Sequence, residues 1–411
     1  MPASTSSTTP ERVDDDGNVH WKRNLVVCLC GSFTTIVAMT MLVPFLPIFV
    51  QELGVHDRDG VLAWSGAAYS ATFLTAALTA PLWGTLGDRY GRKSMLIRAS
   101  FGMAIAMSCI GLVQNVWQLL GMRLLVGLLG GYSSGSTILV AAQTPRDRSA
   151  WALGTLSAGV LAGNIAGPLI GGFAPELVGV RTTFLLAGAL IFVAFLATTF
   201  LLKEDRKPLQ GSQSRKDRLW SRLDNPGQVG LLLGTASLLM FATMSVEPTI
   251  TLFVEQLAGT ARHASMGAGI VMSLGALGSI VSAPRLGRLA DRVGHGRVII
   301  GCLLVAGVCL LAQAAAPNVP ALAVLRLLMG AALGGLLPAI TAAIRHRAPS
   351  DVVGRLLGWS VSAQYVGQVS GPLIGAAVGA RFGLRSVFVA TGAILLAVGV
   401  VNLFSAQRNP L

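Results

Sequence analysis

The sequence predicts an all-α membrane protein with twelve transmembrane helices in two six-helix bundles and both termini in the cytoplasm. Three observations support this fold class. The chain is 53% hydrophobic and only 12% charged, with a mean hydropathy of +0.66, whereas an average soluble domain has about 25% charged residues. Apolar stretches of membrane-spanning length recur along the whole chain, and its two halves repeat each other in sequence.

Twelve apolar stretches are long enough to cross the hydrocarbon core, which takes roughly 20 helical residues. They begin near residues 24, 61, 95, 117, 150, 181, 228, 266, 297, 319, 354 and 385. With both termini inside, 24 of the 31 Lys and Arg residues lie on the inner side, five lie in outer loops and two lie within spans. This asymmetry satisfies the positive-inside rule and predicts the orientation.

The longest break between spans divides them six and six. It carries seven Lys or Arg together with Pro, Gly, Gln and Ser, which is typical of a solvated linker. The first twenty residues show no apolar core followed by a cleavage site, so we expect no removable signal peptide. The predicted segments are a disordered N-terminal tail (1–23), an N-terminal bundle (24–202), a cytoplasmic linker (203–227), a C-terminal bundle (228–405) and a C-terminal tail (406–411).

An internal repeat appears when the chain is aligned with itself at an offset of 203 to 204 residues. Pro44 then matches Pro248, Arg123 matches Arg326, and the Gly-Pro-Leu-Ile-Gly run at 167–171 returns at 371–375. Six spans repeated in one orientation imply two bundles related by an axis along the membrane normal. Such a repeat predicts a substrate site near mid-depth between the bundles and alternating access by rocking of the halves.

Several function classes are excluded by the residue pattern. The net charge of +13 comes from small basic clusters between apolar runs, which argues against a nucleic-acid partner. The five cysteines lie in apolar stretches without paired spacing, so we expect neither a disulfide nor a metal. Gly131-Tyr-Ser-Ser-Gly135 fits a hydrolase pattern but continues span four as a packing face. With no P-loop and no catalytic constellation, we expect no enzyme and no cofactor, and an ion gradient as the energy source.

Two inner loops carry related motifs. The loop after span two contains Gly-Thr-Leu-Gly-Asp-Arg-Tyr-Gly-Arg-Lys, and the loop after span eight contains a weaker copy. A basic, turn-rich inner loop is ordinary, but two copies at matching positions indicate a gate that exchanges charge contacts. The candidate gating residues are Gly84, Asp88, Arg89, Gly91, Arg92, Lys93, Gly287, Asp291 and Arg292.

The first of these loops resembles the signature of the major facilitator superfamily, and the resemblance covers roughly residues 21 to 405. Pro44-Phe-Leu-Pro47, Arg123-Leu-Leu-Val-Gly127 and the Gly-Pro motif of span five resemble the twelve-helix drug:proton antiporter branch. The segments beginning at Trp21 and Trp151 are most similar to MdtG-type multidrug exporters. Glycines every four residues allow close helix approach, and a proline kinks a helix. The antiporter motif comprises Gly163, Gly167, Pro168, Gly171 and Gly172.

Three ionisable residues lie deep in spans: Arg123, Glu247 and Arg326. Burial of such groups is costly, so they should line a cavity or pair with one another. All three fall near mid-depth, and the resemblance places them on helices that line the central cavity. Glu247, beside Pro248, is the candidate proton carrier, because desolvation lets a carboxyl take up and release a proton. A fixed salt bridge to an arginine is the alternative.

One departure from the family concerns helix one, where residues 24–50 carry no acidic residue. Two arginines and one carboxylate would also suit an anionic or zwitterionic substrate. An alternative role for Arg123 is a structural one, in which it bonds helix carbonyls. Six further polar residues either contact substrate or form interhelical contacts. They are Tyr69, Tyr132, Gln143, Asn164, Tyr365 and Gln368.

The sequence therefore predicts a multi-pass bacterial inner-membrane protein that exports small amphipathic compounds by proton-coupled antiport and confers antibiotic resistance. The expected partners are the substrate, protons and membrane lipid, and we expect a monomer. Two alternatives remain open: a dedicated exporter of one metabolite such as a siderophore, and a non-transporting membrane receptor of the same fold.

Overall fold

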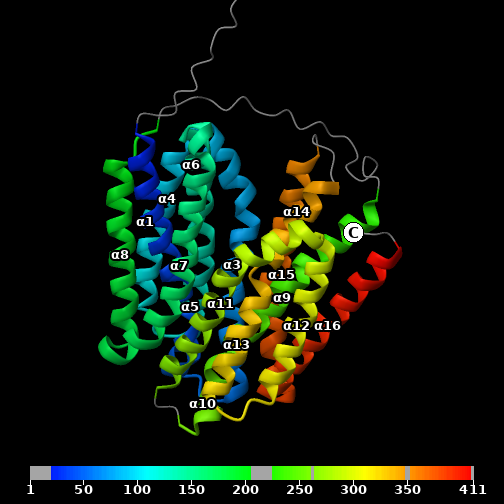
Figure 1. Ribbon diagram of the computed structural model, residues 1–411. Helices are drawn as coiled ribbons and strands as arrows, with labels where there is room; N and C mark the ends of the chain where they lie inside the picture. The colour runs from blue at the N-terminus through cyan, green and yellow to red at the C-terminus, as the bar shows by residue number, and fades with distance from the viewer. Residues whose placement is uncertain (1–19, 205–224, 261–262, 348–351, 409–411) are drawn as a thin grey trace, which may run out of the picture.

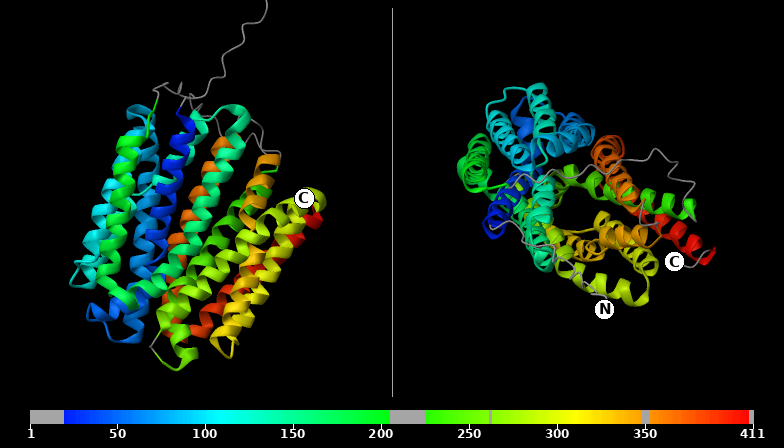
Figure 2. Two further views of the ribbon diagram at one scale, coloured as in Figure 1. Left: turned by 60° about the vertical axis from the view of Figure 1, so that its left-hand side comes forward. Right: turned by 90° about the horizontal axis from the view of Figure 1, so that it is seen from above.

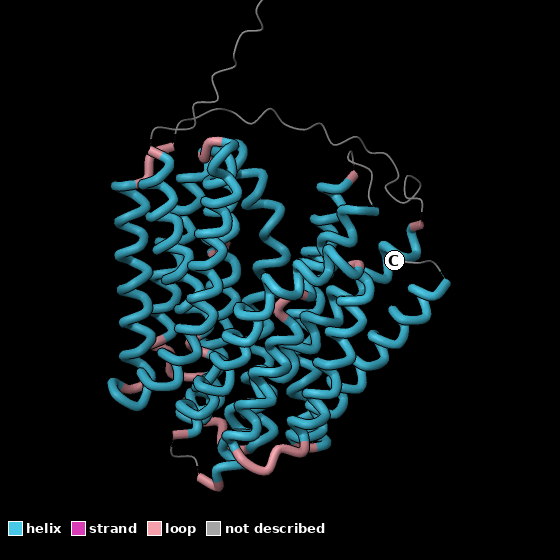
Figure 3. Tube along the Cα trace, viewed as in Figure 1, coloured by secondary structure: helices cyan, strands magenta, loops and turns pink. Residues whose placement is uncertain are grey.

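The computed structural model describes residues 20–204, 225–260, 263–347 and 352–408, and every regular element within them is a helix (Figure 3). Most of the predicted N-terminal tail and of the linker lies outside the described residues. The N-terminal half contains α1 (Trp21–Thr40), η1 (Val43–Phe45), α2 (Leu46–Glu52), α3 (Arg58–Tyr90), α4 (Arg92–Ile110), α5 (Val116–Leu129), α6 (Tyr132–Gln143), α7 (Arg146–Val178) and α8 (Val180–Leu201). The C-terminal half contains α9 (Pro226–Val246), η3 (Glu247–Thr249), α10 (Ile250–Ala258), α11 (Ala264–Val293), α12 (His295–Ala314), α13 (Val319–Leu333), α14 (Leu336–Arg347), α15 (Val353–Phe382) and α16 (Leu384–Arg408).

These helices form the twelve predicted spans, each beginning within four residues of its predicted start. Eleven of the spans are long and apolar enough to cross a membrane. The remaining one, α15, has 30 residues and contains many Gly, Ser and Gln residues, which lower its average hydropathy. It packs against α3, α9 and α16, so its small and polar residues meet other helices as well as lipid.

The helices are arranged as two bundles side by side (Figures 1 and 2). The bundles meet where α3 packs against α15 and where α7 packs against α11. The beginning of α1 and the end of α16 lie at the same end of the molecule, here called the terminal end (Figure 1). The opposite end, which carries α10 and the loop after α2, is called the distal end.

Four of the twelve spans are interrupted. Spans one and seven each contain a short 3-10 helix, η1 or η3, at the matching residues Pro44 and Pro248. A proline lacks the backbone N–H that an α-helix requires, so the interruption follows from the sequence. Span four breaks at Gly130 and Gly131, and span ten breaks at the corresponding point after Leu333. The Gly131 segment continues span four, as predicted, but the helix is interrupted there, which was not expected: Gly131 is left-handed, with φ of 102°.

The glycines of span five have two distinct contact faces. A Cβ atom at Gly163, Gly167 or Gly171 would collide with residues of span one, including the backbone of Met41, which directly follows α1. Gly172 instead faces the other half, because a Cβ there would meet the backbone of α11. The motif therefore lets α7 approach both its neighbour in the N-terminal bundle and the facing helix of the C-terminal bundle.

The hydrogen bonds that join the two halves among the described residues lie in the distal part of the bundle. Ser70 donates to the Val369 carbonyl at 2.7 Å, Ser273 to Ile165 at 2.8 Å and Thr251 to Pro44 at 2.8 Å. Nearer the distal end, Nδ1 of His263 lies 2.6 Å from the Glu176 carboxylate. The described contacts thus close the interface from the distal side.

Candidate functional site

A cavity of about 270 Å³ lies between the two halves, enclosed by residues from spans one, two, five, seven, eight and ten. Its walls are mainly apolar, with a few polar groups, as in many small-molecule sites. Three methionines supply flexible, polarisable surface that adapts to differently shaped ligands. The lining residues are Thr40, Val43, Tyr69, Leu161, Asn164, Pro168, Thr243, Met244, Glu247, Met272, Gly275, Ala276, Ser279, Ile280, Arg326, Met329, Gly330 and Leu333.

An ion pair between Glu247 and Arg326 borders this cavity. Nη2 of Arg326 donates to Oε1 of Glu247 at 3.0 Å, and the two side chains are 4% and 15% exposed, respectively. Glu247 is the first residue of η3, so the break before Pro248 aims its carboxylate inward. The stem of Arg326 packs on Gly275 of α11, where a side chain would crowd it. Nη1 of Arg326 is buried without a hydrogen-bond partner among the described residues, so the pair leaves a donor for a further ligand.

The third charged residue, Arg123, is buried elsewhere. Its Nε donates to the carbonyl of Ala68 on α3 at 3.2 Å, and the residue is only 1% exposed. It is not among the residues that line the cavity. The structure therefore brings two of the three predicted charges together and places Arg123 against a helix carbonyl.

The six polar candidates divide into two groups. Tyr69 and Asn164 line the cavity. The buried hydroxyl of Tyr132 lies 2.7 Å from that of Thr198, within the N-terminal bundle. The remaining three also lie away from the described lining: Gln143 accepts a hydrogen bond from Asn24 at 2.7 Å, while Tyr365 and Gln368 are half-buried on α15.

Sequence reasoning missed the methionines and hydroxyl residues of the cavity, notably Met244, Met272 and Met329. Methionine and threonine are common in any apolar span, so their type alone gave no signal. The interrupted spans offered one, because Met244 and Thr243 directly precede the break at Pro248.

The predicted gating loop between α3 and α4 lies at the terminal end. Arg92 forms an ion pair with Asp88, one helical turn before it. The chain turns at Gly91, whose φ of 91° favours glycine, and the backbone N–H groups of Arg92 and Lys93 donate to the Glu204 carboxylate at 2.8 Å each. Glu204 thereby caps the start of α4 and was not identified from the sequence.

The weaker copy of this loop, between α11 and α12, makes a looser contact. Asp291 lies 3.7 Å from Nε2 of His295, and its side chain is 74% exposed. A Cβ atom at Gly84 or Gly287 would meet nothing within 4 Å, so helix packing does not explain either glycine. Arg89 stacks near Tyr90, and Arg292 is exposed in the last turn of α11.

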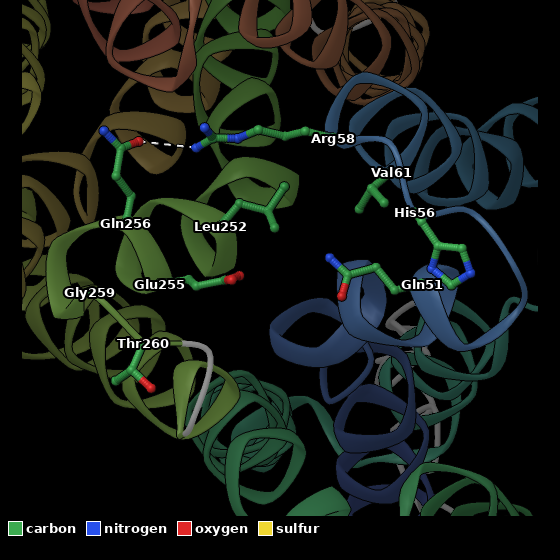
Figure 4. Close-up of a pocket in the computed structure, with 9 residues that line it drawn as sticks. All are labelled: Gln51, His56, Arg58, Val61, Leu252, Glu255, Gln256, Gly259 and Thr260. Atoms are coloured by element: carbon green, nitrogen blue, oxygen red, sulfur yellow. Dashed lines mark hydrogen bonds between the residues drawn. The ribbon is translucent and has the colours of Figure 1, made fainter.

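A second cavity, of about 390 Å³, opens at the distal end between α2, the start of α3 and α10 (Figure 4). Arg58 reaches across from the N-terminal half and donates to Oε1 of Gln256 at 3.1 Å. The Glu255 carboxylate points toward the Gln51 side chain of the other half (Figure 4). This polar cavity is separate from the central one and borders the distal contacts between the halves.

Two six-helix bundles that enclose a cavity with an intramembrane ion pair define a secondary membrane transporter. The chain belongs to the Major Facilitator Superfamily, whose sequence profile matches residues 28–284 and 235–410. The predictions of this family, of an all-α membrane fold and of a transporter instead of an enzyme are confirmed, while the cytoplasmic placement of both termini stays a prediction. The chain is a multi-pass protein of the bacterial inner membrane. Its spans are helices, as is typical of inner-membrane proteins, whereas outer-membrane proteins are typically β-barrels.

Relatives with similar sequences include multidrug resistance proteins MdtG. The protein of Klebsiella pneumoniae (strain 342) is 40% identical over 394 residues, covering 96% of each chain. That of Yersinia enterocolitica is 40% identical over 395 residues, covering 96% of this chain and 95% of the relative. The resemblance to MdtG-type proteins is thus confirmed.

Solved structures with the same fold are more distant in sequence. A bacterial homologue of the human lysosomal transporter Spinster, in an inward-facing and unoccupied conformation, superposes with a TM-score of 0.76 at 15% identity, covering 95% of this chain and 98% of that one. A D-xylose–proton symporter gives a TM-score of 0.76 at 14% identity, covering 93% and 97%. These similarities establish the fold.

Proposed function

We propose that this transporter exports small amphipathic compounds from the cytoplasm by proton-coupled antiport with alternating access. The observation that carries the proposal is the Glu247–Arg326 pair in the wall of the central cavity. The names of the MdtG relatives as multidrug resistance proteins support the substrate class. A predominantly apolar cavity with three methionines and a few hydroxyl groups suits amphipathic molecules of varied shape.

Glu247 is the proposed proton carrier. As a carboxylate it is neutralised by Arg326 at 3.0 Å, and as a carboxylic acid it releases that arginine. Protonation therefore changes the charge that the cavity presents to substrate, which is the differential contact that coupling requires. No histidine and no second carboxyl group is among the described lining residues, so Glu247 is the one acidic side chain that the cavity offers as a proton carrier.

The proposed transport cycle places the terminal end in the cytoplasm, as the distribution of Lys and Arg predicts. In that orientation the distal hydrogen bonds between the halves close the cavity from the outside. Opening to the outside would break these bonds and bring the terminal ends of the halves together, with Asp88 and Asp291 at the meeting point. We also propose that the transporter acts as a monomer, because each chain supplies both halves of the cavity.

The test is transport by proteoliposomes after a pH jump, with a panel of cationic, zwitterionic and anionic drugs. Wild type should move several drugs against their gradients, and Glu247→Gln should abolish this uphill movement. A matched control is Glu255→Gln, the same chemical change in the distal cavity, which should leave coupling intact.

A second measurement separates a proton carrier from a fixed salt bridge. Exchange of labelled for unlabelled drug at equal pH needs no net proton movement. If Glu247 carries the proton, Glu247→Gln should lose uphill transport and keep exchange. Loss of both would favour the fixed salt bridge, and movement of one compound only would favour a dedicated exporter. No flux by wild type would refute the transport proposal.

A further inference from the structure

Span four is broken more completely than its repeat in span ten. Gly130 is extended, with ψ of −168°, and Gly131 is left-handed, so two consecutive residues leave the helical conformation between α5 and α6. In span ten, Gly334 keeps helical angles and its N–H still donates to the Gly330 carbonyl at 3.0 Å. A full break leaves the carbonyl groups of the last turn without partners inside the helix.

Two side chains from neighbouring spans occupy this break. Nη2 of Arg98, on α4, donates to the Gly130 carbonyl at 3.1 Å, and its Nη1 lies 3.5 Å from the Leu128 carbonyl. Nε1 of Trp83, on α3, donates to the same Leu128 carbonyl at 2.8 Å. The Arg98 guanidinium also stacks on the Trp83 ring, 3.5 Å from its centre. We call Arg98 and Trp83 together the span-four clamp.

The internal repeat does not account for this clamp. At the offset of 203 residues, Gly301 stands in place of Arg98 and Leu286 in place of Trp83. In the C-terminal bundle, span ten is interrupted although neither matching position carries an arginine or a tryptophan. The fold alone therefore does not require these two side chains.

The clamp distinguishes a broken span from a straight one. In a continuous α-helix, the carbonyls of Leu128 and Gly130 would accept hydrogen bonds from the N–H groups four residues later. Arg98 and Trp83 would then share these acceptors with the helix, so their hydrogen bonds would weaken. A contact that is stronger in one of two conformations shifts the equilibrium toward that conformation.

We propose that the span-four clamp holds α6 in the bent position that keeps the terminal ends of the two halves apart, with Arg98 as a positioning residue for the inner gate. α6 forms the terminal part of span four and packs on α1, α4 and α7 of its own half. Straightening of span four would redirect α6. The clamp therefore opposes the closing of the two halves against each other at the terminal end. The proposal rests on the alternating access described above.

The test is a distance measurement by double electron–electron resonance in lipid nanodiscs. Spin labels at Thr137 on α6 and Thr341 on α14 are both exposed and report the separation of the halves at the terminal end. The background carries Cys30→Ser, because that native cysteine is exposed. Loss of a stacked, hydrogen-bonded guanidinium in Arg98→Gln should lower the ratio of long to short distances on the order of tenfold.

Further variants exclude a general loss of structure. Trp83→Phe keeps the ring under the guanidinium but loses the N–H donor, so a smaller shift of about threefold is expected. Trp83→Leu, which reproduces the residue at 286, should shift the ratio in the same direction. The matched control is Arg285→Gln. Exposed Arg285 donates to the Val281 carbonyl of its own helix and to no other group among the described residues, so its ratio should equal that of wild type.

Two negative results have different meanings. If wild type shows both distances and neither Arg98→Gln nor Trp83→Phe changes their ratio, the clamp proposal is overturned while alternating access stands. If wild type shows a single distance at every pH and drug concentration, alternating access itself fails, and the clamp proposal fails with it.

Discussion

Loss of one partner of the Glu247–Arg326 pair should destabilise the protein more than loss of both. The two side chains are 15% and 4% exposed and lie 3.0 Å apart. Breaking a buried ion pair costs about 3–5 kcal/mol because it leaves an uncompensated charge, whereas neutral replacement of both partners is often tolerated. Since Glu247 borders a cavity, we expect the lower value: about 3 kcal/mol for Arg326→Gln and less than about 1 kcal/mol for the double variant with Glu247→Gln.

The assay is the apparent melting temperature of purified protein in detergent, measured for wild type, both single variants and the double variant. Arg326→Gln should melt lower than wild type by on the order of 5 °C, and the double variant should recover most of that loss. Glu255→Gln, outside the central cavity, serves as the control for a carboxylate lost at the protein surface. Additive losses, with the double variant melting below both singles, would refute the reasoning that the two charges stabilise each other.

Three further predictions use the same melting assay together with drug efflux. Gly171→Val should cost about 3 kcal/mol or more and abolish efflux, because its side chain would meet the backbone of Met41 in span one. The control Gly154→Ala meets nothing within 4 Å and should match wild type. Glu204→Ala should cost about 1–2 kcal/mol, since it removes two hydrogen bonds from the start of α4, and an unchanged melting temperature would contradict that role. Tyr132→Phe should cost about 1 kcal/mol through its lost contact with Thr198 and leave the substrate profile unchanged, so an altered profile would place Tyr132 in the substrate path.

The fold was largely predictable because membrane insertion imposes length and charge rules on every span. Each predicted start lies within four residues of the observed one. The interruptions of spans one and seven coincide with the prolines at 44 and 248, which the repeat had aligned. The break of span four was missed. Glycines at 127, 131 and 135 look alike in the sequence, yet only Gly131 adopts a left-handed conformation, and the side chains that stabilise the break come from α3 and α4.

The site was less predictable, because depth within a span does not determine which way a side chain points. Arg123, Glu247 and Arg326 were predicted to fall near mid-depth, and only the last two meet in the cavity, while Arg123 takes the alternative role of bonding a helix carbonyl. Tyr69 and Tyr132 were equivalent candidates by residue type. One lines the cavity, while the other is buried within its own bundle against Thr198. Such differences depend on helix rotation, for which the span boundaries give no information.

The internal repeat explains why the two arginines differ. Arg123 and Arg326 occupy matching positions, but the residue before the proline of span one is Val43, whereas its counterpart in span seven is Glu247. Both residues line the cavity. Where the carboxylate is present, the arginine turns into the cavity to meet it. Where valine replaces it, the arginine turns away and bonds a backbone carbonyl at 3.2 Å. A single acidic residue, in one repeat only, thus converts a structural arginine position into a charge in the cavity wall.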